Sequence, residues 1–450
     1  MKKYLVTLIL IINIIFALDW VNTGDLVRAK YVFGLIQGFN GYLYAGAVID
    51  TTSADSGWVY YSSDYLNWQR CINLPGDQSG VYHLINGIGD TLFAGSSSWT
   101  GSNWEPRVYK SGDGGQNWTM LGSIPTPISG TQVWALSEGR NGNLYAGINW
   151  LSIHSSATPV YSTDRGQTWL NSINSCPYSP TSEFCLIEAS DGNLYVGTWA
   201  GQRRLVYKST NQSQNWIETD TMFDSGQARA LIEGPPGTLF AGTYPKTIPQ
   251  QPIGRVFKST NGGSSWQQIG YGYFTNTSGI RSLYFTSDGR LFAGTVPQGE
   301  VFVSQDTGNT WTSTGVLPGA NSVYRFLEVQ VGESTYLYAA TGPNGDVFRA
   351  SIEPQVGIAK KSKIYQQPIT IYPNPTTDIL TITLPQNREQ KINATIYNVS
   401  GQKVKEFVLK DFPQSYVRLS LKNQGIDKGL YFLKLSIGKQ SVVKRFLMLY

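Results

Sequence analysis

The sequence predicts an all-β protein made of a seven-bladed β-propeller followed by a small Ig-like antiparallel β-sandwich. Three observations predict it. A Ser-x-Asp-x-Gly-x-x-Trp pattern recurs along the first three quarters of the chain, and a Leu-aromatic-Ala-Gly pattern precedes each copy. After residue 369 the repeats give way to alternating apolar and polar runs. The 48 glycines, 13% aromatic residues and only 14% charged residues suit short strands joined by tight turns.

Residues 1–17 are expected to be a signal peptide. Lys2 and Lys3 precede an apolar run that ends at Phe16, and Ala17 offers a small residue for cleavage. The run is short for a membrane span, and no later segment is apolar over a sufficient length. We therefore expect a mature protein that is exported through the periplasm and has no transmembrane span.

The Trp-containing pattern is interpreted as scaffold. In the copy Ser162–Trp169, Asp164 can accept hydrogen bonds from turn amides, Gly166 permits an unusual backbone conformation, and Trp169 packs inward. Asparagine replaces the aspartate in two copies, which a turn tolerates and a catalytic carboxylate would not. The residues assigned this structural role are Asp64, Asp113, Asp164, Asn211, Asn261 and Asp306.

The second pattern sets the number of blades. Its seven copies begin at Leu43, Leu92, Leu144, Leu194, Leu239, Leu291 and Leu337, with a period of 45–52 residues. Each unit holds four short apolar runs separated by turn signals, as a propeller blade does. The last unit lacks a Trp run, and the segment around Trp20 can supply its missing outer strand. Residues 18–352 are therefore expected to form the propeller, closed by the N-terminal strand.

These repeats resemble the Asp-box, or BNR, repeats of sialidases, xyloglucanases and seven-bladed photosystem assembly factors. The resemblance implies that the box turns lie on the face away from the ligand. Two features depart from the enzymes: the sialidase Arg-Ile-Pro motif is absent, and only one propeller is present where the xyloglucanases have two. No pair of loop acids stands out among Asp50, Asp55, Asp77, Glu105, Glu183, Asp220, Asp224 and Glu300. We therefore assign no catalytic residue.

Metal and cofactor sites are not expected. The two histidines, His83 and His154, lie far apart, and the three cysteines show no Cys-x-x-Cys spacing. Cys176 and Cys185 could pair during export, but the position of Cys185 in a buried strand favours a free or partly paired set.

Residues 369–450 follow a linker at 353–368 and resemble the type A C-terminal sorting domain of the type IX secretion system. The resemblance rests on the Tyr372-Pro373-Asn374-Pro375 motif, the Gly401 turn, Gly429-Leu430-Tyr431 and the Lys444 strand. It implies that the secretion machinery is a partner and that the protein reaches the cell surface or medium. This segment is basic, with 12 Lys and Arg against 5 Asp and Glu, whereas residues 19–352 hold 18 against 24. The large region thus lacks the basic field that nucleic-acid binding requires.

A ligand site is expected where the innermost strands border the central channel. Aligned on their leucines, the seven strands place four aromatic residues and then three arginines two positions earlier: Phe33, Tyr82, Trp134, Phe184, Arg229, Arg281 and Arg325. Three converging guanidinium groups would bind an anion, as the arginine triad of sialidases holds a sugar carboxylate. Alternatively, each arginine spans two blades and pairs with a glutamate such as Glu233 or Glu328.

The loops on the same face carry further aromatic residues: Trp99, Trp150, Trp199 and Tyr244, with Trp104 nearby. Flat side chains suit the apolar faces of sugar rings, but they also suit rim packing or a protein contact. The sequence therefore predicts an exported surface or secreted protein that binds a glycan or another extracellular polymer. A sialidase-like glycoside hydrolase and a protein-assembly scaffold with a protein ligand remain as alternatives.

Overall fold

The computed structural model describes most of the chain. The described residues are 17–49, 57–71, 74, 78–99, 102, 104–125, 132–149, 159–173, 182–199, 205–223, 225–245, 253–353, 371–372, 376, 378–383, 392–398, 402–409, 416–421, 424–437 and 440–448. The apolar segment 1–16, Trp150, Cys176, the Pro373–Pro375 motif and Gly401 lie outside them. By their contacts the residues divide into two compact units, the first ending at Ile352 and the second containing Glu353–Tyr450.

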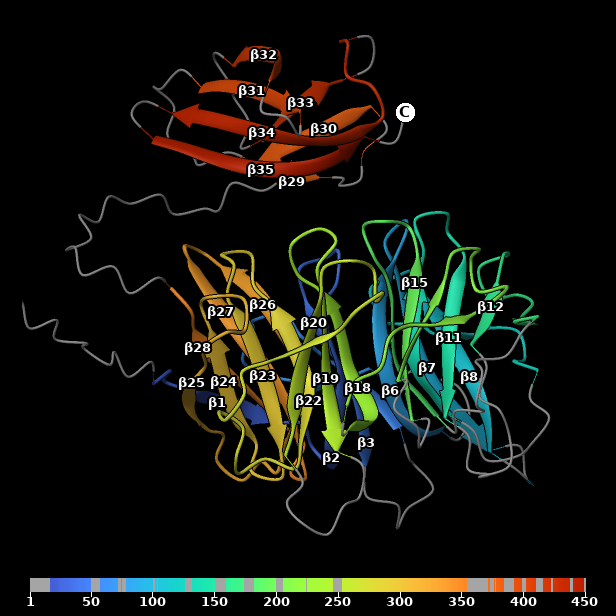
Figure 1. Cartoon of the computed structure of the whole chain (residues 1–450). Helices are drawn as coiled ribbons and strands as arrows, with labels where there is room; N and C mark the ends of the chain where they lie inside the picture. Colours follow the sequence, from blue (N-terminus) through green and yellow to red (C-terminus); the bar gives the residue numbers. More distant parts are fainter. Residues whose placement is uncertain are drawn as a thin grey trace, which may run out of the picture. The chain divides into compact units, whose positions relative to one another are not determined.

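The described residues of the first unit form seven four-stranded antiparallel blades, of which blades 3 to 5 are joined into one sheet by single-residue bridges, and they confirm the predicted propeller (Figure 1). From the innermost strand outward, blade 1 is β2 (Ala29–Gln37), β3 (Leu43–Ile49), β4 (Gly57–Ser62) and β5 (Gln69–Arg70). Blade 2 is β6 (Gln78–Gly87), β7 (Thr91–Trp99), β8 (Trp104–Ser111) and β9 (Thr119–Met120). Blade 3 is β10 (Gln132–Glu138), β11 (Leu144–Asn149), β12 (Val160–Ser162) and β13 (Leu170–Asn171). Blade 4 is β14 (Ser182–Glu188), β15 (Leu194–Trp199), β16 (Val206–Ser209) and β17 (Ile217–Glu218).

Blades 5 to 7 continue the same order. Blade 5 is β18 (Ser225–Glu233), β19 (Leu239–Pro245), β20 (Arg255–Ser259) and β21 (Gln267–Ile269). Blade 6 is β22 (Gly279–Phe285), β23 (Leu291–Val296), β24 (Glu300–Ser304) and β25 (Thr312–Val316). Blade 7 is β26 (Ser322–Val331), β27 (Ser334–Gly342), β28 (Asp346–Ser351) and β1 (Val21–Asp25). The described residues contain no helix, and so none long and apolar enough to cross a membrane.

The N-terminal strand β1 joins the two ends of the propeller chain. It pairs with β28 from Val21 opposite Arg349 to Asp25 opposite Asp346. The Trp20 indole nitrogen donates to the Thr314 hydroxyl of blade 6 at 3.2 Å. The Trp68 indole of blade 1 donates to the hydroxyl of Thr23, within β1, at 3.0 Å. Blade 7 is therefore bonded through its outer strand to both neighbouring blades.

The glycine of the Leu-aromatic-Ala-Gly repeat allows neighbouring blades to approach. A Cβ atom on Gly95 would lie 2.7 Å from the Val133 side chain of the next blade, and one on Gly242 would lie 2.7 Å from Ile280. Both distances are shorter than real Cβ contacts. The core lies between the blades: Phe93 of blade 2 packs with Val133 and Leu136 of blade 3.

A glutamate in the second half of the innermost strand links each of four blades to the blade before it. Glu188 accepts a hydrogen bond from the Arg140 amide at 2.8 Å. The other three links are of the same kind, with the donors in the turn between the first two strands of the preceding blade. Glu138 accepts from the Ile88 amide, Glu233 accepts from the amide and hydroxyl of Ser190, and Glu328 accepts from the amide and hydroxyl of Ser287. These carboxylates satisfy backbone donors at the blade edge.

The Ser-x-Asp segments form tight turns between the third and fourth strands of their blades. The Asp164 carboxylate accepts from the Thr168 amide at 2.8 Å and from the Thr168 hydroxyl at 2.6 Å. The Ser162 hydroxyl accepts from the Gly166 amide at 2.7 Å, and Gly166 has φ of +88°. The side-chain oxygens of Asn211 and Asn261 accept the equivalent amides at 2.9 Å. The Asp oxygen thus serves as a hydrogen-bond acceptor in the turn.

The second unit consists of two sheets, as expected for a small antiparallel sandwich. One contains β29 (Ile371–Tyr372), β30 (Ile379–Thr383) and β33 (Tyr416–Ser420). The other contains β31 (Ile392–Asn398), β32 (Lys403–Leu409), β34 (Gly429–Ile437) and β35 (Gln440–Met448). Their inner faces share one core, with Leu380 and Ile382 from the first sheet and Ile396, Leu433 and Phe446 from the second.

Loss of the Trp20 side chain should weaken the closed ring. Trp20 is half-buried and packs against the core of blades 6 and 7. We expect Trp20→Ala to lower the free energy of unfolding by about 2–4 kcal/mol, because packing and the bond to Thr314 are both lost. Urea unfolding of the full chain measures this. Val21→Ala, at a side chain 54% exposed, is the control and should change little; equal losses in both variants would contradict the role of Trp20.

The turn aspartates should contribute stability in a pH-dependent way. Hydrogen bonds from the Thr168 hydroxyl and amide lower the pKa of Asp164 to about 2, below the value of about 3.9 in an unfolded chain. The charged carboxylate therefore stabilises the fold above about pH 4, and this contribution is lost as the pH falls toward 2. Urea titrations should show a difference between the native protein and Asp164→Ala that is constant from pH 5 to 7 and shrinks below pH 4. A difference independent of pH would show that the charge is not involved.

Candidate ligand-binding cavity at the centre of the propeller

Six innermost strands carry a β-bulge at the same place, and the bulged residue of each lies at the centre of the ring. The hydrogen-bond register breaks around Phe33, Tyr82, Trp134, Phe184, Arg229 and Arg281. A bulge leaves one residue unpaired and turns its side chain away from the regular alternation. Sequence reasoning identified these six residues by their distance from the leucine that follows them.

In blade 7 the equivalent residue is Tyr324, and the alignment that placed Arg325 there is wrong by one position. In blades 4 and 6, the residue after the bulge donates to a carbonyl of the next blade: Cys185 to Ala228 at 3.7 Å and Ser282 to Val323 at 2.8 Å. Val323 therefore corresponds to Ala228, and Tyr324 corresponds to Arg229. The error has a physical cause: in β26 the buried core position belongs to Phe326, which is 2% exposed, and not to Leu327.

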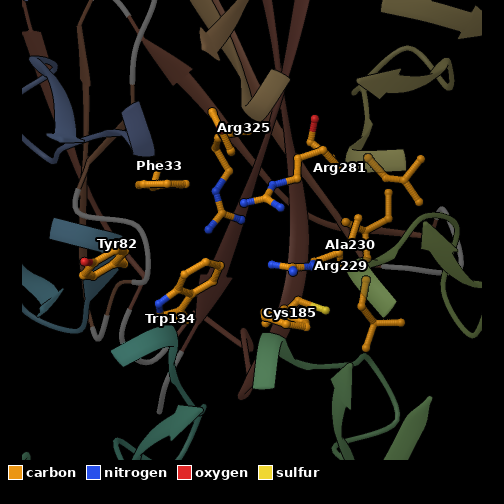
Figure 2. Close-up of a pocket in the computed structure, with 14 residues that line it drawn as sticks. Phe33, Tyr82, Trp134, Cys185, Arg229, Ala230, Arg281 and Arg325 are labelled. Atoms are coloured by element: carbon orange, nitrogen blue, oxygen red, sulfur yellow. The ribbon is translucent and has the colours of Figure 1, made fainter. Parts of the chain in front are cut away.

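The bulged residues and their neighbours line a partly open cavity of about 80 Å³. Figure 2 shows its two-sided character: Arg229, Arg281 and Arg325 point toward the centre from one side, and Phe33, Tyr82 and Trp134 face them. Arg325 is one residue beyond the bulge position, which Tyr324 occupies in blade 7. The guanidinium group of Arg325 nevertheless lines the cavity. The structure thus brings together all seven residues of the expected row, with Tyr324 added.

The arginines are held by aromatic rings and neutral acceptors. The Arg229 guanidinium carbon lies 3.5 Å from the Phe184 ring centroid, and its Nε donates to the Gln227 side-chain oxygen at 2.7 Å. The Arg281 guanidinium lies 4.7 Å from the Tyr324 ring centroid and donates to the Tyr244 hydroxyl at 3.4 Å. These contacts orient the cations without neutralising their charge.

No carboxylate of the described residues lies within salt-bridge distance of these three arginines. Glu233 and Glu328, the partners considered from the sequence, lie four and three residues beyond Arg229 and Arg325 and bind Ser190 and Ser287. Desolvation, followed by repulsion from Arg281, lowers the pKa of Arg229 to about 9. Desolvation also lowers the pKa of Arg325. Since Arg229 remains protonated at neutral pH, the cavity carries positive charge that no carboxylate of the described residues neutralises.

The opposite wall is a chain of aromatic contacts. Tyr82 and Trp134 stack with ring centroids 5.6 Å apart and an interplanar angle of 13°. Phe33 lies 5.6 Å from Tyr82, and Phe184 lies 5.5 Å from Trp134. His83 lies in the layer next to Tyr82, where its Nδ1 accepts the Leu136 amide at 2.9 Å and burial lowers its pKa well below the usual value. His83 is therefore a packed, neutral residue.

The loop aromatics occupy different environments. Tyr244 belongs to the cavity mouth through its contacts with both Arg229 and Arg281. Trp199 is 44% exposed, and its backbone pairs with Gln227, the residue that holds Arg229. Trp99 is 41% exposed and packs on Trp104 at 5.4 Å, away from the lining residues of the cavity.

Sequence reasoning missed Gln227 and Tyr324. The backbone of Gln227 pairs with Trp199 in β15 and with Tyr244 in β19. Its side-chain oxygen accepts the hydrogen bond from Arg229 Nε and so orients the guanidinium group. A signal for Tyr324 was present: a small or β-branched residue precedes each bulge except in blade 4, and Val323 precedes Tyr324.

The described loop acids form no catalytic pair in this region. Glu105 forms an ion pair with Arg107 at 2.5 Å, and Glu300 accepts from the Ser313 hydroxyl at 2.5 Å. Asp50, Asp55, Asp77 and Asp224, and the side chain of Glu183, lie outside the described residues. Within the described part of the chain, no group of three His, Cys, Asp or Glu residues could hold a metal ion.

Comparison with known proteins identifies the C-terminal segment. Residues 370–448 match the family described as the secretion system C-terminal sorting domain. The chain carries a type IX sorting domain. The protein is therefore exported to the cell surface or secreted, and this domain implies interaction with the secretion machinery.

The first unit resembles known propeller-like proteins. A xyloglucanase from Paenibacillus sp is 25% identical over 273 residues, covering 51% of this chain and 25% of the relative. The chain thus spans a quarter of the length of that curated relative. Among solved structures, YCF48 from Cyanidioschyzon merolae has a TM-score of 0.53 at 12% identity, covering 74% of this chain and 98% of that one. A GH74 enzyme from Niastella koreensis has a TM-score of 0.54 at 12% identity, covering 94% and 73% of the two chains. At these identities the likeness supports the fold alone.

The described cysteines should be chemically inert in the folded protein. Cys71 and Cys185 are free thiols, and burial raises the pKa of each to about 12. Because the thiolate is the reactive form, we expect less than about 1% labelling of either residue by iodoacetamide at pH 8 in the time that labels the urea-unfolded chain completely. Peptide mapping by mass spectrometry reads each site separately. Rapid labelling of Cys185 in the native protein would contradict the closed packing beside Arg229.

Proposed function

We propose that this protein is an exported binding protein whose propeller recognises an anionic group of an extracellular polymer, most simply an acidic glycan. The observation that carries the proposal is the convergence of Arg229, Arg281 and Arg325 on one small cavity without a described carboxylate partner. Buried charges in proteins are normally paired. A cluster of three cations therefore favours an anion that arrives from outside.

The energetics support this reading. Bringing guanidinium groups together out of water is unfavourable, and the lowered pKa of Arg229 reports this cost. A bound oxyanion would offset the repulsion and receive charge-assisted hydrogen bonds from rigidly held donors. The rings of Phe184 and Tyr324 and the side chain of Gln227 already orient the arginines, so little ordering is required on binding.

The exposed rim suits a polymer that continues beyond the cavity. Trp199 and Tyr244 lie on either side of Gln227 in adjacent strands. Their flat faces can contact the apolar face of a sugar ring. A glycan would then be held by an anionic group in the cavity and by ring stacking above it.

A hydrolase is the second candidate, favoured by the similarity to the xyloglucanase. A glycosidase requires two carboxyl groups about 5–9 Å apart across the scissile bond. The cavity lining contains none among the described residues. The binding proposal is therefore preferred, and any glycan that binds would next be tested for cleavage.

The full chain should bind acidic polysaccharides on a glycan array, and the triple variant Arg229→Ala/Arg281→Ala/Arg325→Ala should lose this binding. Each charge-assisted bond contributes about 1.5–3 kcal/mol, so we expect a loss of affinity of at least about 100-fold. Arg140→Ala is the matched control, because Arg140 is exposed, pairs with Glu188 and does not line the cavity.

The alternatives give different results. Binding to neutral glycans that the triple variant retains would place recognition at the rim aromatics and contradict the arginine site. Binding to no glycan at all would reject glycan recognition and leave a protein ligand to be sought.

A further inference from the structure

The third residue after each blade tryptophan makes a repeated contact between neighbouring blades. At four junctions this residue is Ser or Thr, and its hydroxyl accepts a hydrogen bond from the indole of the next blade. The pairs are Trp68 with Thr23 at 3.0 Å, Trp216 with Ser172 at 3.1 Å, Trp266 with Thr219 at 3.1 Å and Trp20 with Thr314 at 3.2 Å. Each hydroxyl also donates to a carbonyl at or beside the third strand of its own blade, at 2.6 to 3.0 Å. We call this residue the latch position.

Three junctions have no hydroxyl at the latch position, where the residues are Cys71, Leu121 and Ile269. At two of them the indole bonds within its own turn: Trp118 donates to the Gly115 carbonyl at 3.0 Å. Trp311 donates in the same way to the Gly308 carbonyl at 2.9 Å. At the junction of blades 2 and 3, the Trp169 indole nitrogen is buried and has no hydrogen-bond partner among the described residues.

The neighbours of Trp169 explain its unpaired donor. Leu121 occupies the latch position and packs in the same core as Trp169. The Gly166 carbonyl, equivalent to those of Gly115 and Gly308, already accepts the amide of Gly122 from blade 2 at 2.8 Å. A buried donor without an acceptor costs free energy. This junction therefore lacks a stabilising bond that the other junctions or their turns supply.

A groove of about 690 Å³ lies at the outer end of the same junction. Its lining includes Met120, Leu121 and Gly122 of blade 2 and Gln167 of blade 3. Met120 is 49% exposed. Solvent thus reaches the side chain at the latch position, and the outer half of the junction has both a missing bond and an open edge.

The inner half of the junction is bonded. The Leu136 amide of blade 3 donates to His83 Nδ1 of blade 2 at 2.9 Å. The Glu138 carboxylate of blade 3 accepts from the Ile88 amide of blade 2. These bonds come from the innermost strands, so blades 2 and 3 are joined near the axis and weakly joined at the outer edge.

We propose that the junction of blades 2 and 3 is a hinged seam, which opens locally at its outer half while its inner bonds stay formed. Local openings begin where stabilising contacts are fewest. Tyr82 of blade 2 and Trp134 of blade 3 stack beside the inner bonds, with ring centroids 5.6 Å apart and an interplanar angle of 13°. Opening of the seam therefore tilts one ring against the other and changes the shape of the aromatic wall of the cavity. The proposal does not depend on which ligand the cavity binds.

Three backbone amides at equivalent places report on three junctions. Each follows the latch position and donates to a carbonyl in the turn of the next blade: Gly122 to Gly166 at 2.8 Å, Ile173 to Gln214 at 2.8 Å and Asp220 to Gly263 at 2.9 Å. In the full chain we expect the Gly122 amide to exchange its hydrogen at least about fivefold faster than the other two, after correction for intrinsic rates, because one hydrogen bond fewer holds its junction. Mass spectrometry with residue-level fragmentation measures this.

Two results of the exchange experiment would overturn the proposal. Equal exchange at the three amides would show that blades 2 and 3 open no more readily than blades 3 to 5. Exchange of the Leu136 amide as fast as that of Gly122 would show that the whole junction opens and that the inner bonds are not a hinge.

A hydroxyl placed at position 121 should close the seam. Leu121→Thr can donate to the Val108 carbonyl, which already accepts the Leu121 amide, and accept from the Trp169 indole, as Thr219 does from Trp266. Leu121→Val is the matched control, because its side chain has a similar shape without the hydroxyl. We expect the Gly122 amide to exchange about fivefold more slowly in Leu121→Thr than in Leu121→Val.

Repeating this comparison in Trp169→Phe separates the latch from other effects of the hydroxyl. Phenylalanine removes the indole donor, so the difference between the Thr and Val variants should disappear. Near-UV circular dichroism verifies the fold of all variants. Equal exchange of the Thr and Val variants with Trp169 present, or an equal benefit of Thr in both backgrounds, would overturn the assignment of the seam to the missing indole bond.

Discussion

Ring closure by the pairing of β1 with β28 is the interaction on which the rest of the propeller depends. Six blades place a bulged residue at the axis and blade 7 places Tyr324 there, and these residues meet only if the first and last blades are joined. Val21 to Asp25 supply the last strand, and Trp20 and Trp68 connect it to blades 6 and 1. With an open ring, Phe33 of blade 1 and Tyr324 of blade 7 could not lie 4.5 Å apart, and the cavity would have no closed wall.

The scaffold separates its two uses of charged residues by position along the strand. At one end of the innermost strands, glutamates accept hydrogen bonds from the turns of preceding blades. At the bulge and one position beyond it, arginines face the axis without carboxylate partners among the described residues. Arg229 and Glu233 are four residues apart along one strand, and the glutamate is held by Ser190 of the preceding blade, so that carboxylates that stabilise the ring do not neutralise the cavity. The positive charge of the cavity is thereby available to a ligand.

Much of the fold could be predicted because each repeat encodes its own blade. The glycine after Leu-aromatic-Ala is required where the next blade approaches, and the Ser-x-Asp turn is satisfied by atoms within eight residues. Local requirements of this kind are visible in any single copy. The row of central residues was also predictable in six blades, where a leucine follows the bulge. It failed by one residue in blade 7, because Phe326 replaces the leucine in the buried position.

The sequence by itself determined the all-β class, the seven repeats, the candidate closing strand and the aromatic and arginine residues of the innermost strands, because these follow from periodicity and local turn chemistry. Only the tertiary structure decided which charges meet. Glu233 and Arg229 lie four residues apart in one strand, yet the glutamate binds Ser190 and the arginine binds Gln227 and Phe184. The reason is that the partners of both residues come from neighbouring strands and blades, and their distances are set by the twist and closure of the ring.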